Sequence, residues 1–539
     1  MNRFYNNIII PFFLIVLSTI LLFVYCKYYG ITYLTFSDGA KFADIARNMY
    51  YGFGFNGNFS FWNKDLIDLS IKSVFPSPWV PPLMPFFIMI FFKIFGISDF
   101  SVIATSFVFF ILSVLFTYIL GRKLFGKLVG LISAVAVLFN ESLILYGLSG
   151  ASEPILIFEI VATAYFITIK KKWATILASI FMVLMYFTRP QGFIYIICLI
   201  LFWLLVNFKL KKAILSFFGI IILGLFVDKF ILANFAGKYF LYPILARGQD
   251  ALVKITTTSS PSDALRGVIE EATLISSLKK IFYNLYNFYK MLPQILSPYL
   301  FVLFLISLFY WTKNKLLNAF KISVTVMVLL TFLTAAISIP LFRYLHPIIP
   351  LVYIVASEML VLICRNFIVC GKLIKKDVCI NVVCILLIFI FCGGQILGVI
   401  FLDSRFKSKL VNIGKPPVYV VLSKLLKENT NEDELILTNL DTWGSWYGNR
   451  KTVWYPMSPD AIIPSDGQKN SLDIIYLTSY LVDDENYYMG EEWKQIFLNP
   501  NNIKNEYILK NYKIKTTFDI KADDVYENYS AHAILLVKR

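Results

Sequence analysis

A succession of apolar segments, each about as long as a lipid bilayer is thick, restricts what this chain can fold into. An α-helix rises about 1.5 Å per residue, so roughly 20 apolar residues cross a hydrocarbon core of about 30 Å. The sequence holds about eleven nearly uncharged segments of this kind, and 58% of its residues are hydrophobic. We therefore predict a polytopic α-helical membrane protein. The predicted spans are residues 8–26, 99–121, 128–146, 154–169, 173–188, 192–207, 213–233, 294–311, 318–338, 346–364 and 378–402.

Basic residues gather in every second loop between these spans. Loops rich in Lys and Arg lie on the cytosolic side of a membrane, so the alternation predicts an orientation. It also accounts for the net charge of +16 without a nucleic-acid partner, which we do not expect. With Arg3 inside and an odd number of spans, the C-terminal tail is predicted to lie outside. The basic loops lie at residues 122–127, 170–172, 209–212, 313–321 and 365–376.

Cysteine and histidine usage narrows the chemistry. All seven cysteines lie in or beside predicted spans or in a cytosolic loop, so disulfides do not hold the tail together. The only histidines are His346 and His532, which argues against zinc chemistry and a His-dependent hydrolase triad. The first apolar segment is not followed by a small-residue cleavage site. We interpret it as a retained span of a protein in the cytoplasmic (inner) membrane.

Two outer loops and the tail carry most of the predicted extracytoplasmic mass. The first loop, residues 27–98, is aromatic and rich in Gly and Pro. Within it, residues 83–95 form an apolar run that is short for a span, and we interpret it as a helix in the membrane interface. The alternative is the opening turns of a longer second span. The other outer loop is residues 234–293, where Ser260-Pro261-Ser262-Asp263 has the pattern of a helix start.

The chain changes character near residue 403, where long apolar segments give way to a polar sequence. Residues 403–539 contain 17 Lys and Arg against 19 Asp and Glu. A helix is predicted over 418–427, and buried strands over 435–438, 474–477 and 533–537. We therefore divide the chain into a membrane domain, residues 1–402, and a soluble extracytoplasmic α/β domain, residues 403–539. Three tail tryptophans are expected to fill the core of that domain: Trp443, Trp446 and Trp454.

Four polar places on the predicted outer side stand out against the apolar background. Their side chains include two carboxylates and two arginines, which by topology meet at one membrane face. Transfer from a lipid phosphate needs a base for the acceptor hydroxyl and cations for the phosphate. Arginine offers a planar fork that phosphate oxygens match. The places are Asp38, the loop 147–154 with Glu153, the segment 188–192 with Arg189, and the segment 342–347 with Arg343, Tyr344 and His346.

A structural interpretation of these residues competes with the catalytic one. Polar side chains at a membrane surface also cap helices and pair with one another. Acids inside predicted spans raise the same question. Glu141 and Glu159 lie near the outer ends of neighbouring spans, and with His346 they are predicted to line the cavity. They are equally compatible with hydroxyl partners between helices. Asp228 and Glu358 also lie within spans, and Lys229 is the expected partner of Asp228.

The order of these motifs resembles the GT-C superfamily of membrane glycosyltransferases. Within that superfamily, it is similar to the protein O-mannosyltransferase and lipid A aminoarabinose transferase relatives. The resemblance covers about 400 residues of the membrane region, and less specifically the tail. It rests on Asp38 after the first span, Ala46-Arg47-Asn48, Gly52-Phe53-Gly54-Phe55, Pro81-Pro82-Leu83-Met84-Pro85, Phe91-Phe92-Lys93-Ile94-Phe95-Gly96, Ser152-Glu153-Pro154, Arg189-Pro190-Gln191-Gly192 and Arg343-Tyr344.

The resemblance implies a reaction and roles for several residues. Such enzymes transfer a sugar from a polyprenyl-phosphate donor to an acceptor hydroxyl outside the membrane, with inversion. Asp38 matches the proposed catalytic base, and Glu153 matches a second acid near the acceptor or the base. Arg343 and Arg189, with Tyr344, would hold the donor phosphate. Many members have Asp-Glu where this chain has Asp38-Gly39, which leaves the acceptor class open among lipid, glycan and protein.

The predicted chemistry requires no cofactor. Because phosphate leaves well, inversion by direct displacement needs a base but no general acid. A divalent metal would be compatible with the reaction, but no residue pattern indicates one. Two other function classes remain: a transporter or flippase of a lipid-linked glycan, and a non-catalytic assembly factor. Long, unequal outer loops and a large external tail favour the enzyme over a transporter, which typically shows internal repeats.

Overall fold

The structure is a computed structural model of the 539-residue chain. The chain forms two compact units. The first consists of Met1–Tyr25, Ser106–Ile255 and Glu271–Asp403, and the second of Cys26–Thr105, Thr256–Glu270 and Ser404–Arg539. The residues that the structure describes are 2–28, 30–61, 75–76, 80–227, 254–255, 270–271, 274–337, 340–367, 376–397, 414–456, 458–464, 472–480, 482 and 489–539.

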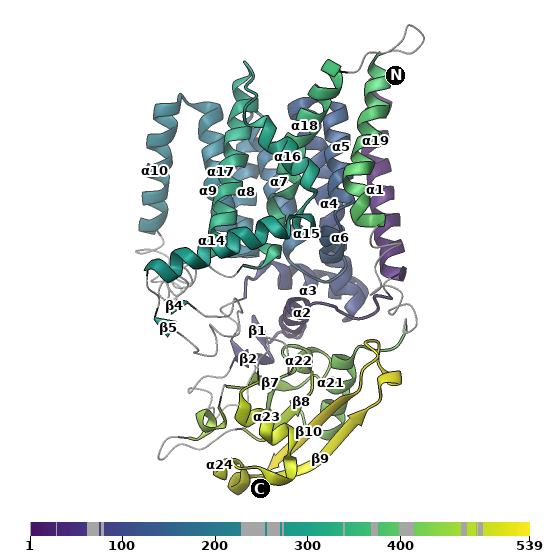
Figure 1. Ribbon diagram of the computed structural model, residues 1–539, viewed down its shortest axis with the longest axis vertical. Coiled ribbons are helices and arrows are strands. Elements are labelled where there is room, and N and C mark those ends of the chain that lie inside the picture. Colours follow the sequence, from purple (N-terminus) through teal and green to yellow (C-terminus); the bar gives the residue numbers. More distant parts are fainter. Residues whose placement is uncertain are drawn as a thin grey trace. The chain divides into compact units, whose positions relative to one another are not determined.

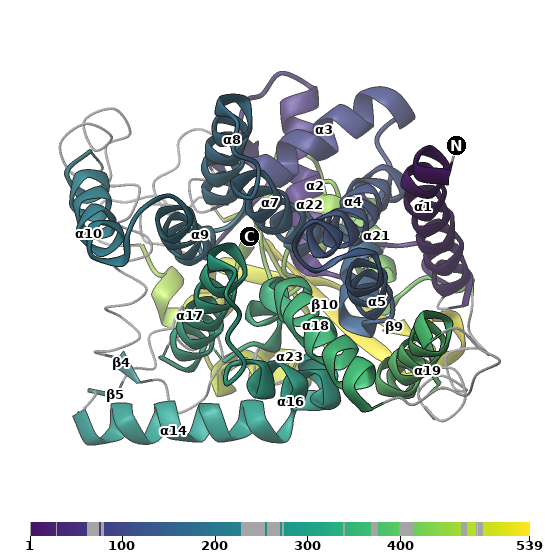
Figure 2. The ribbon, with the colours of Figure 1, turned by 90° about the horizontal axis from the view of Figure 1, so that it is seen from above.

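The first unit is a bundle of α-helices (Figure 1). Figure 2 shows many of them end on, and α14 lies across their direction. The pairs α7–α8, α16–α18, α9–α17 and α5–α18 pack together. The helices that contribute are α1 (Asn2–Tyr28), α4 (Asp99–Phe125), α5 (Lys127–Leu138), α6 (Glu141–Gly147), α7 (Glu153–Ile167), α8 (Lys172–Thr188), α9 (Gly192–Asn207), α10 (Leu210–Val227), α14 (Leu274–Lys290), α15 (Leu292–Ile295), α16 (Pro298–Ser307), α17 (Lys315–Ile337), α18 (Ile349–Phe367) and α19 (Lys376–Leu397).

Four helical segments among the described residues are long and apolar enough to cross a membrane. A fifth is formed if the bent pair α5–α6 counts as one span. Shorter apolar helices, including α8, α9 and α16, lie where the sequence predicts further spans. The four segments are Ile8–Lys27, Asp99–Phe125, Lys315–Ile337 and Phe342–Phe367.

The predicted span at 128–146 is a helix in two pieces. Its halves, α5 and α6, are bent by 69° at a short break. Asn140 occupies the break and caps α6, because its side chain accepts a hydrogen bond of 3.1 Å from the backbone N–H of Leu143. The bend precedes the polar loop that contains Ser152 and Glu153.

A buried ion pair joins α17 to α18 in this unit. Lys321 Nζ lies 2.7 Å from Glu358 Oε2, and both side chains are buried. The pairing explains how Glu358 is accommodated within an apolar helix, since a buried charge requires a partner. The expected pair of Asp228 and Lys229 lies outside the described residues, as does the predicted helix start at 260–263.

The second unit combines the first loop with the tail. In the loop, α2 (Ser37–Tyr50) packs against α3 (Leu83–Phe95). The predicted helix at 83–95 is confirmed with the same bounds. It begins after Pro82 and ends at Gly96, whose φ of 81° is easily reached only by glycine. The short strands β1 (Asn56–Gly57) and β3 (Phe75–Pro76) pair beside them.

The tail forms a six-stranded mixed sheet in the order β2-β7-β6-β8-β10-β9. The pairs β2–β7, β7–β6 and β6–β8 are parallel, whereas β10 is antiparallel to β8 and β9. The chain passes from β6 to β7 on one side and later to β8 on the other side. The strands are β2 (Phe59–Phe61), β6 (Leu435–Thr438), β7 (Lys451–Trp454), β8 (Ile474–Thr478), β9 (Tyr512–Ile520) and β10 (Ala531–Lys538).

The predictions for the tail are confirmed at the level of its elements. The predicted strand at 435–438 is β6, and those at 474–477 and 533–537 lie within β8 and β10. The predicted helix at 418–427 is α21 (Val418–Asn429). The edge strand β2 comes from the first loop, although its sequence lies far from the tail. The buried hydrophobic residues form two clusters, one of which contains Trp454.

Candidate functional site

Asp38 lies in the first turn of α2, in the second unit. A carboxylate is favoured there because the first turn of a helix presents unpaired backbone N–H groups. Its side chain is about a quarter exposed, and Lys41 Nζ, one turn later, lies 3.3 Å from Asp38 Oδ1. The carboxylate therefore sits at a partly open position with a cation beside it.

The following turns of α2 anchor it by a buried ion pair. Arg47 Nη2 donates a hydrogen bond of 2.6 Å to Asp44 Oδ1. The same guanidinium donates to the backbone carbonyls of Ser445 (2.8 Å) and Trp446 (3.1 Å) in the tail. Asp44 also accepts a hydrogen bond from the side chain of Asn58. Because the partners satisfy this buried pair, it fixes α2 against the tail.

The tail segment that receives α2 is the short helix α22 (Trp443–Trp446) with the loop before it. Thr442 Oγ1 donates a hydrogen bond of 2.7 Å to the carbonyl oxygen of Ser37, next to Asp38. Trp446 Nε1 and the Tyr447 hydroxyl each donate one of 2.7 Å to the Asp99 carboxylate. The Trp446 ring stacks on Phe92 with a centroid separation of 6.0 Å.

The three tail tryptophans are buried, as predicted. Trp446 also contacts the first loop, whereas Trp454 belongs to a hydrophobic cluster of the tail. Trp443 stacks on Tyr419 at 4.1 Å, and the Tyr419 hydroxyl donates to the carbonyl of Leu34 in the first loop. These aromatic side chains join the tail to the loop that carries Asp38.

Glu153 and Arg189 form a second constellation, in the helical unit. Glu153, in the first turn of α7, is fully buried. Arg189 follows the last residue of α8, and its guanidinium forms an ion pair with the Glu153 carboxylate. Arg189 Nη1 also donates a hydrogen bond of 3.2 Å to Ser152 Oγ. The loop 147–154 and the end of the fifth predicted span thus meet, as the sequence suggests.

Tyr344 lies near both arginines of this constellation. The guanidinium carbons of Arg189 and Arg343 are 5.9 and 5.5 Å from the centre of its ring. Its backbone carbonyl accepts a hydrogen bond of 3.3 Å from the hydroxyl of Tyr195, on α9. Two cations around one aromatic ring, with one carboxylate, leave a net charge of +1 among Glu153, Arg189 and Arg343.

The predicted cavity-lining residues have identifiable surroundings. His346 is buried, and its Nδ1 lies 2.8 Å from the Tyr146 hydroxyl. Glu159 is buried in α7, where Thr188 Oγ1 lies 2.9 and 2.8 Å from its two carboxylate oxygens. This matches the alternative of a hydroxyl partner on a neighbouring helix. Glu141 begins α6 and is half-buried.

The structure thus brings Glu153, Arg189, Arg343 and Tyr344 together in one unit and places Asp38 in the other unit. A buried carboxylate held by an arginine is suited to fixing that arginine, and a partly exposed carboxylate is suited to exchanging a proton. The described residues include no cluster of three His, Cys, Asp or Glu side chains suited to a metal ion. The sequence analysis missed the tail residues Thr442 and Trp446. Their position just after a buried parallel strand was the available signal, because functional residues gather at such strand ends.

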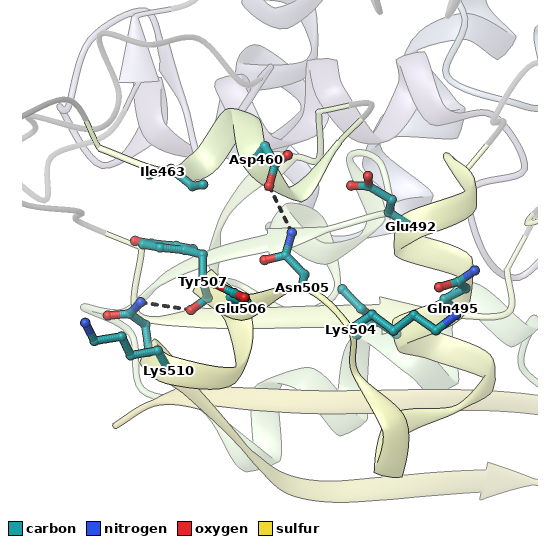
Figure 3. A pocket seen from close by; sticks show the side chains of 11 residues that line it. Asp460, Ile463, Glu492, Gln495, Lys504, Asn505, Glu506, Tyr507 and Lys510 are labelled. Atoms are coloured by element: carbon teal, nitrogen blue, oxygen red, sulfur yellow. Dashed lines mark hydrogen bonds between the residues drawn. The ribbon is translucent and has the colours of Figure 1, made fainter.

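The tail also contains an open polar pocket of about 840 Å³. Figure 3 shows that its charged and amide side chains come from separate segments of the tail, and that Asn505 donates a hydrogen bond of 2.9 Å to Asp460. None of the sequence-predicted site residues lines it. The lining residues include Asp460, Glu492, Gln495, Lys504, Asn505, Glu506, Tyr507 and Lys510.

The fold is similar to that of solved membrane glycosyltransferases. ArnT from Cupriavidus metallidurans, bound to undecaprenyl phosphate, has 10% sequence identity and a TM-score of 0.53, with 97% of each chain covered. The archaeal oligosaccharyltransferase AglB from Archaeoglobus fulgidus, in complex with an inhibitory peptide and a dolichol-phosphate, has 11% identity and a TM-score of 0.51. That match covers 88% of this chain and 70% of AglB. The chain therefore shares the fold of these two solved proteins.

A family model agrees with this similarity. Residues 79–231 match the model of the dolichyl-phosphate-mannose-protein mannosyltransferase family. No curated protein sequence matches the chain. The family-model match covers less than a third of the chain, and it agrees with the solved structures and with the resemblance that the motifs indicate.

Proposed function

We propose that this protein transfers a sugar from a polyprenyl-phosphate donor to an acceptor hydroxyl on the outer face of the cytoplasmic membrane. The observation that carries the proposal is the GT-C fold over nearly the whole chain. The undecaprenyl phosphate and dolichol-phosphate bound to the two similar structures support this donor class. In this proposal about eleven spans cross the membrane and the tail lies outside.

Asp38 is the proposed catalytic base. Its carboxylate accepts the proton of the acceptor hydroxyl while that oxygen attacks the anomeric carbon of the sugar. The bond between the anomeric carbon and the phosphate oxygen breaks, and polyprenyl phosphate leaves with the bonding electrons. Attack opposite the leaving group inverts the anomeric configuration. Its partial exposure and its anchored helix support this role for Asp38.

The constellation around Tyr344 is the proposed donor-phosphate site. The guanidinium carbons of Arg189 and Arg343 lie 5.9 and 5.5 Å from the centre of the same ring, so two cations are close together. Glu153 holds Arg189 in place, and Arg343 and Arg189 are the cations proposed to bind the phosphate. Such cations stabilise the negative charge that builds up on the departing phosphate.

A transfer assay with a matched pair of carboxylate substitutions tests the proposal. Purified protein in lipid receives radiolabelled polyprenyl-phosphate sugars and membrane extract as acceptor. Asp38→Asn is expected to slow transfer by about 10²–10⁴-fold, the usual contribution of a general base. Asp523→Asn makes the same chemical change at an exposed position of the tail, and is expected to leave transfer unchanged.

Two outcomes would overturn the proposal. If Asp38→Asn still transfers sugar at the wild-type rate, Asp38 is not the catalytic base. Label that crosses the bilayer while still attached to the donor would identify a transporter. NMR analysis of the product's anomeric configuration tests inversion separately, and a retained configuration would exclude direct displacement.

A further inference from the structure

The loop between β6 and α22 brings a second carboxylate to the site of Asp38. Asp441 lies in this loop, one residue before Thr442, which donates its hydroxyl to the carbonyl of Ser37. The Asp441 carboxylate accepts hydrogen bonds from the Ser37 side chain and from the backbone N–H of Thr442. It interacts electrostatically with both Asp38 and Lys41. Two acids, from separate segments of the chain, therefore interact electrostatically with one lysine.

The backbone at Asp441 is held in an uncommon conformation. Its φ is 52°, in the left-handed region that non-glycine residues seldom adopt. Such conformations persist where surrounding contacts determine them, and they concentrate at functional sites. Here those contacts include the side chain of Asn439, two residues earlier in the loop. Asn439 donates to the carbonyls of Thr478 and Tyr480 and accepts from the backbone N–H of Thr478.

The position of the loop in the sheet agrees with a functional role. β6 is a central parallel strand, with β7 on one side and β8 on the other. The chain leaves β6 toward β7 and later returns to β8 on the opposite side. Crevices at the carboxyl ends of strands at such switch points commonly hold functional groups. Asp441 occupies this position.

We propose that Asp441 is a positioning residue for Asp38: it shares Lys41 with Asp38, holds Ser37 in place, and sets how readily Asp38 accepts a proton. The inference rests on the proposed function, in which Asp38 is the base. The negative charge of Asp441 opposes ionisation of Asp38 and so offsets part of the opposite effect of Lys41. Asp441 thereby keeps Asp38 more basic than an ion pair with Lys41 alone would allow.

Among the residues that the structure describes, a few charged groups lie on the elements around this pair. On α2 they are Asp38, Lys41 and the ion pair of Asp44 with Arg47. The element packed on α2, α3, carries one charged residue, the exposed Lys93, and α22 and β1 carry none. Asp99 is engaged by Trp446 and Tyr447. Burial raises the pKa of Asp441, the charge of Lys41 lowers it, and the charge of Asp38 raises it again.

The pH–rate profile of Asp441→Asn tests the proposal against a merely structural role. Asp441→Asn removes a negative charge that opposes ionisation of Asp38. Asp38 therefore ionises more easily and becomes a weaker base. The acid limb is expected to move to lower pH by roughly 0.5–1 unit. The plateau is expected to fall about three- to tenfold. Asp441→Glu keeps the charge and is expected to keep the limb at its wild-type pH.

Thr442→Val is the matched structural control. It removes a neutral hydrogen bond from the same loop to Ser37, so it is expected to lower the plateau without moving the acid limb. If Asp441→Asn behaves in the same way, with an unmoved limb, the electrostatic role of Asp441 is refuted. An unchanged rate and profile would refute the positioning role altogether.

Thermal unfolding across pH provides a readout that does not depend on transfer. Because burial raises the pKa of Asp441 above its unfolded value near 3.8, the native state binds this proton more tightly than the unfolded state does. The wild-type contribution to stability is therefore lost as pH rises from that value through the raised pKa. Asp441→Asn lacks this loss, so the gap between its midpoint and that of the wild type is expected to change with pH.

Lys41→Met separates failure of this inference from failure of the proposed function. Without the lysine, ionised Asp441 is less well compensated, so the loss of stability with pH is expected to be larger than in the wild type. The protein could transfer no sugar and still show a pH-dependent midpoint gap for Asp441→Asn and a larger loss of stability with pH for Lys41→Met. That result would refute the proposed function but support the coupling of Asp441 to Lys41. Parallel midpoint–pH curves for wild type and both variants would refute the coupling itself.

Discussion

Asp38 and Glu153 are both carboxylates in the first turn of a helix, but the protein surrounds them differently. Asp38 is about a quarter exposed and has a lysine of its own helix beside it. Glu153 is fully buried, and its partner Arg189 comes from the end of another helix. An exposed carboxylate can exchange partners with a substrate, whereas a buried one cannot lose its partner cheaply. We therefore assign proton transfer to Asp38 and the positioning of Arg189 to Glu153.

The supports of the two carboxylates differ as well. α2 is held by a hydrogen bond that its Ser37 carbonyl accepts from Thr442 and by one that Arg47 donates to the tail. Glu153 is held within the helical unit, where Ser152 also contacts Arg189. Substitutions that disturb one support should therefore have different consequences from substitutions that disturb the other.

The largest effect is expected for Glu153→Gln. It leaves the guanidinium of Arg189 buried without its carboxylate, which typically costs about 3–5 kcal/mol. Thermal unfolding of the protein in lipid measures the loss. Glu358→Gln is the matched control because Glu358 pairs with buried Lys321 in the same unit. Both variants should be destabilised, but only Glu153→Gln should also weaken donor binding. Equal donor affinity in the two would contradict the role of Glu153 in holding Arg189.

Arg343→Gln is expected to act on binding more than on stability. Loss of a charge-assisted hydrogen bond to the donor phosphate costs about 1.5–3 kcal/mol, or roughly ten- to hundredfold in affinity. The KM for the lipid donor should rise by that factor. Arg365→Gln removes the same charge at an exposed position near the end of α18, and should leave KM unchanged. If Arg343→Gln alters only the melting midpoint, Arg343 is structural.

The sequence predicts the elements of the tail better than it predicts their partners. Short continuous apolar runs identified β6, β8 and β10, because a buried strand leaves a local pattern. It gave no indication that β2, from the first loop, completes the same sheet. Pairing over such a distance in sequence depends on shape and hydrogen bonds that no local pattern records. The tail was therefore predicted as an independent domain, whereas the first loop belongs to the same compact unit.

The candidate site shows the same division. Arg189, Glu153 and Arg343 stood out because charges are rare in apolar sequence, and the structure brings them around Tyr344. The contacts of Trp446 with the first loop could not be predicted in this way. Aromatic residues are abundant in this chain, at 17%, so a tryptophan in the tail was read as core. Its hydrogen bond to Asp99 and its contact with Phe92 depend on tertiary structure alone.

The smallest effect is expected for two buried tyrosines of the tail. One is hydrogen-bonded to the first loop and the other within the tail. The hydroxyl of Tyr419 donates to the carbonyl of Leu34 in the first loop (2.6 Å), and that of Tyr476 donates to Leu422 within the tail (3.0 Å). Replacing either tyrosine by phenylalanine removes one neutral hydrogen bond and should cost about 1 kcal/mol. Thermal unfolding should therefore not distinguish the two variants.

Limited proteolysis and the transfer rate should distinguish them. Tyr419→Phe loosens the attachment of the first loop, so cleavage within residues 27–36 is expected to accelerate and transfer to slow about two- to fivefold. Tyr476→Phe leaves that attachment intact and is expected to change neither. If both variants lose transfer equally, the effect follows tail stability in general. The attachment at Leu34 would then have no separate part in holding the segment that leads to Asp38.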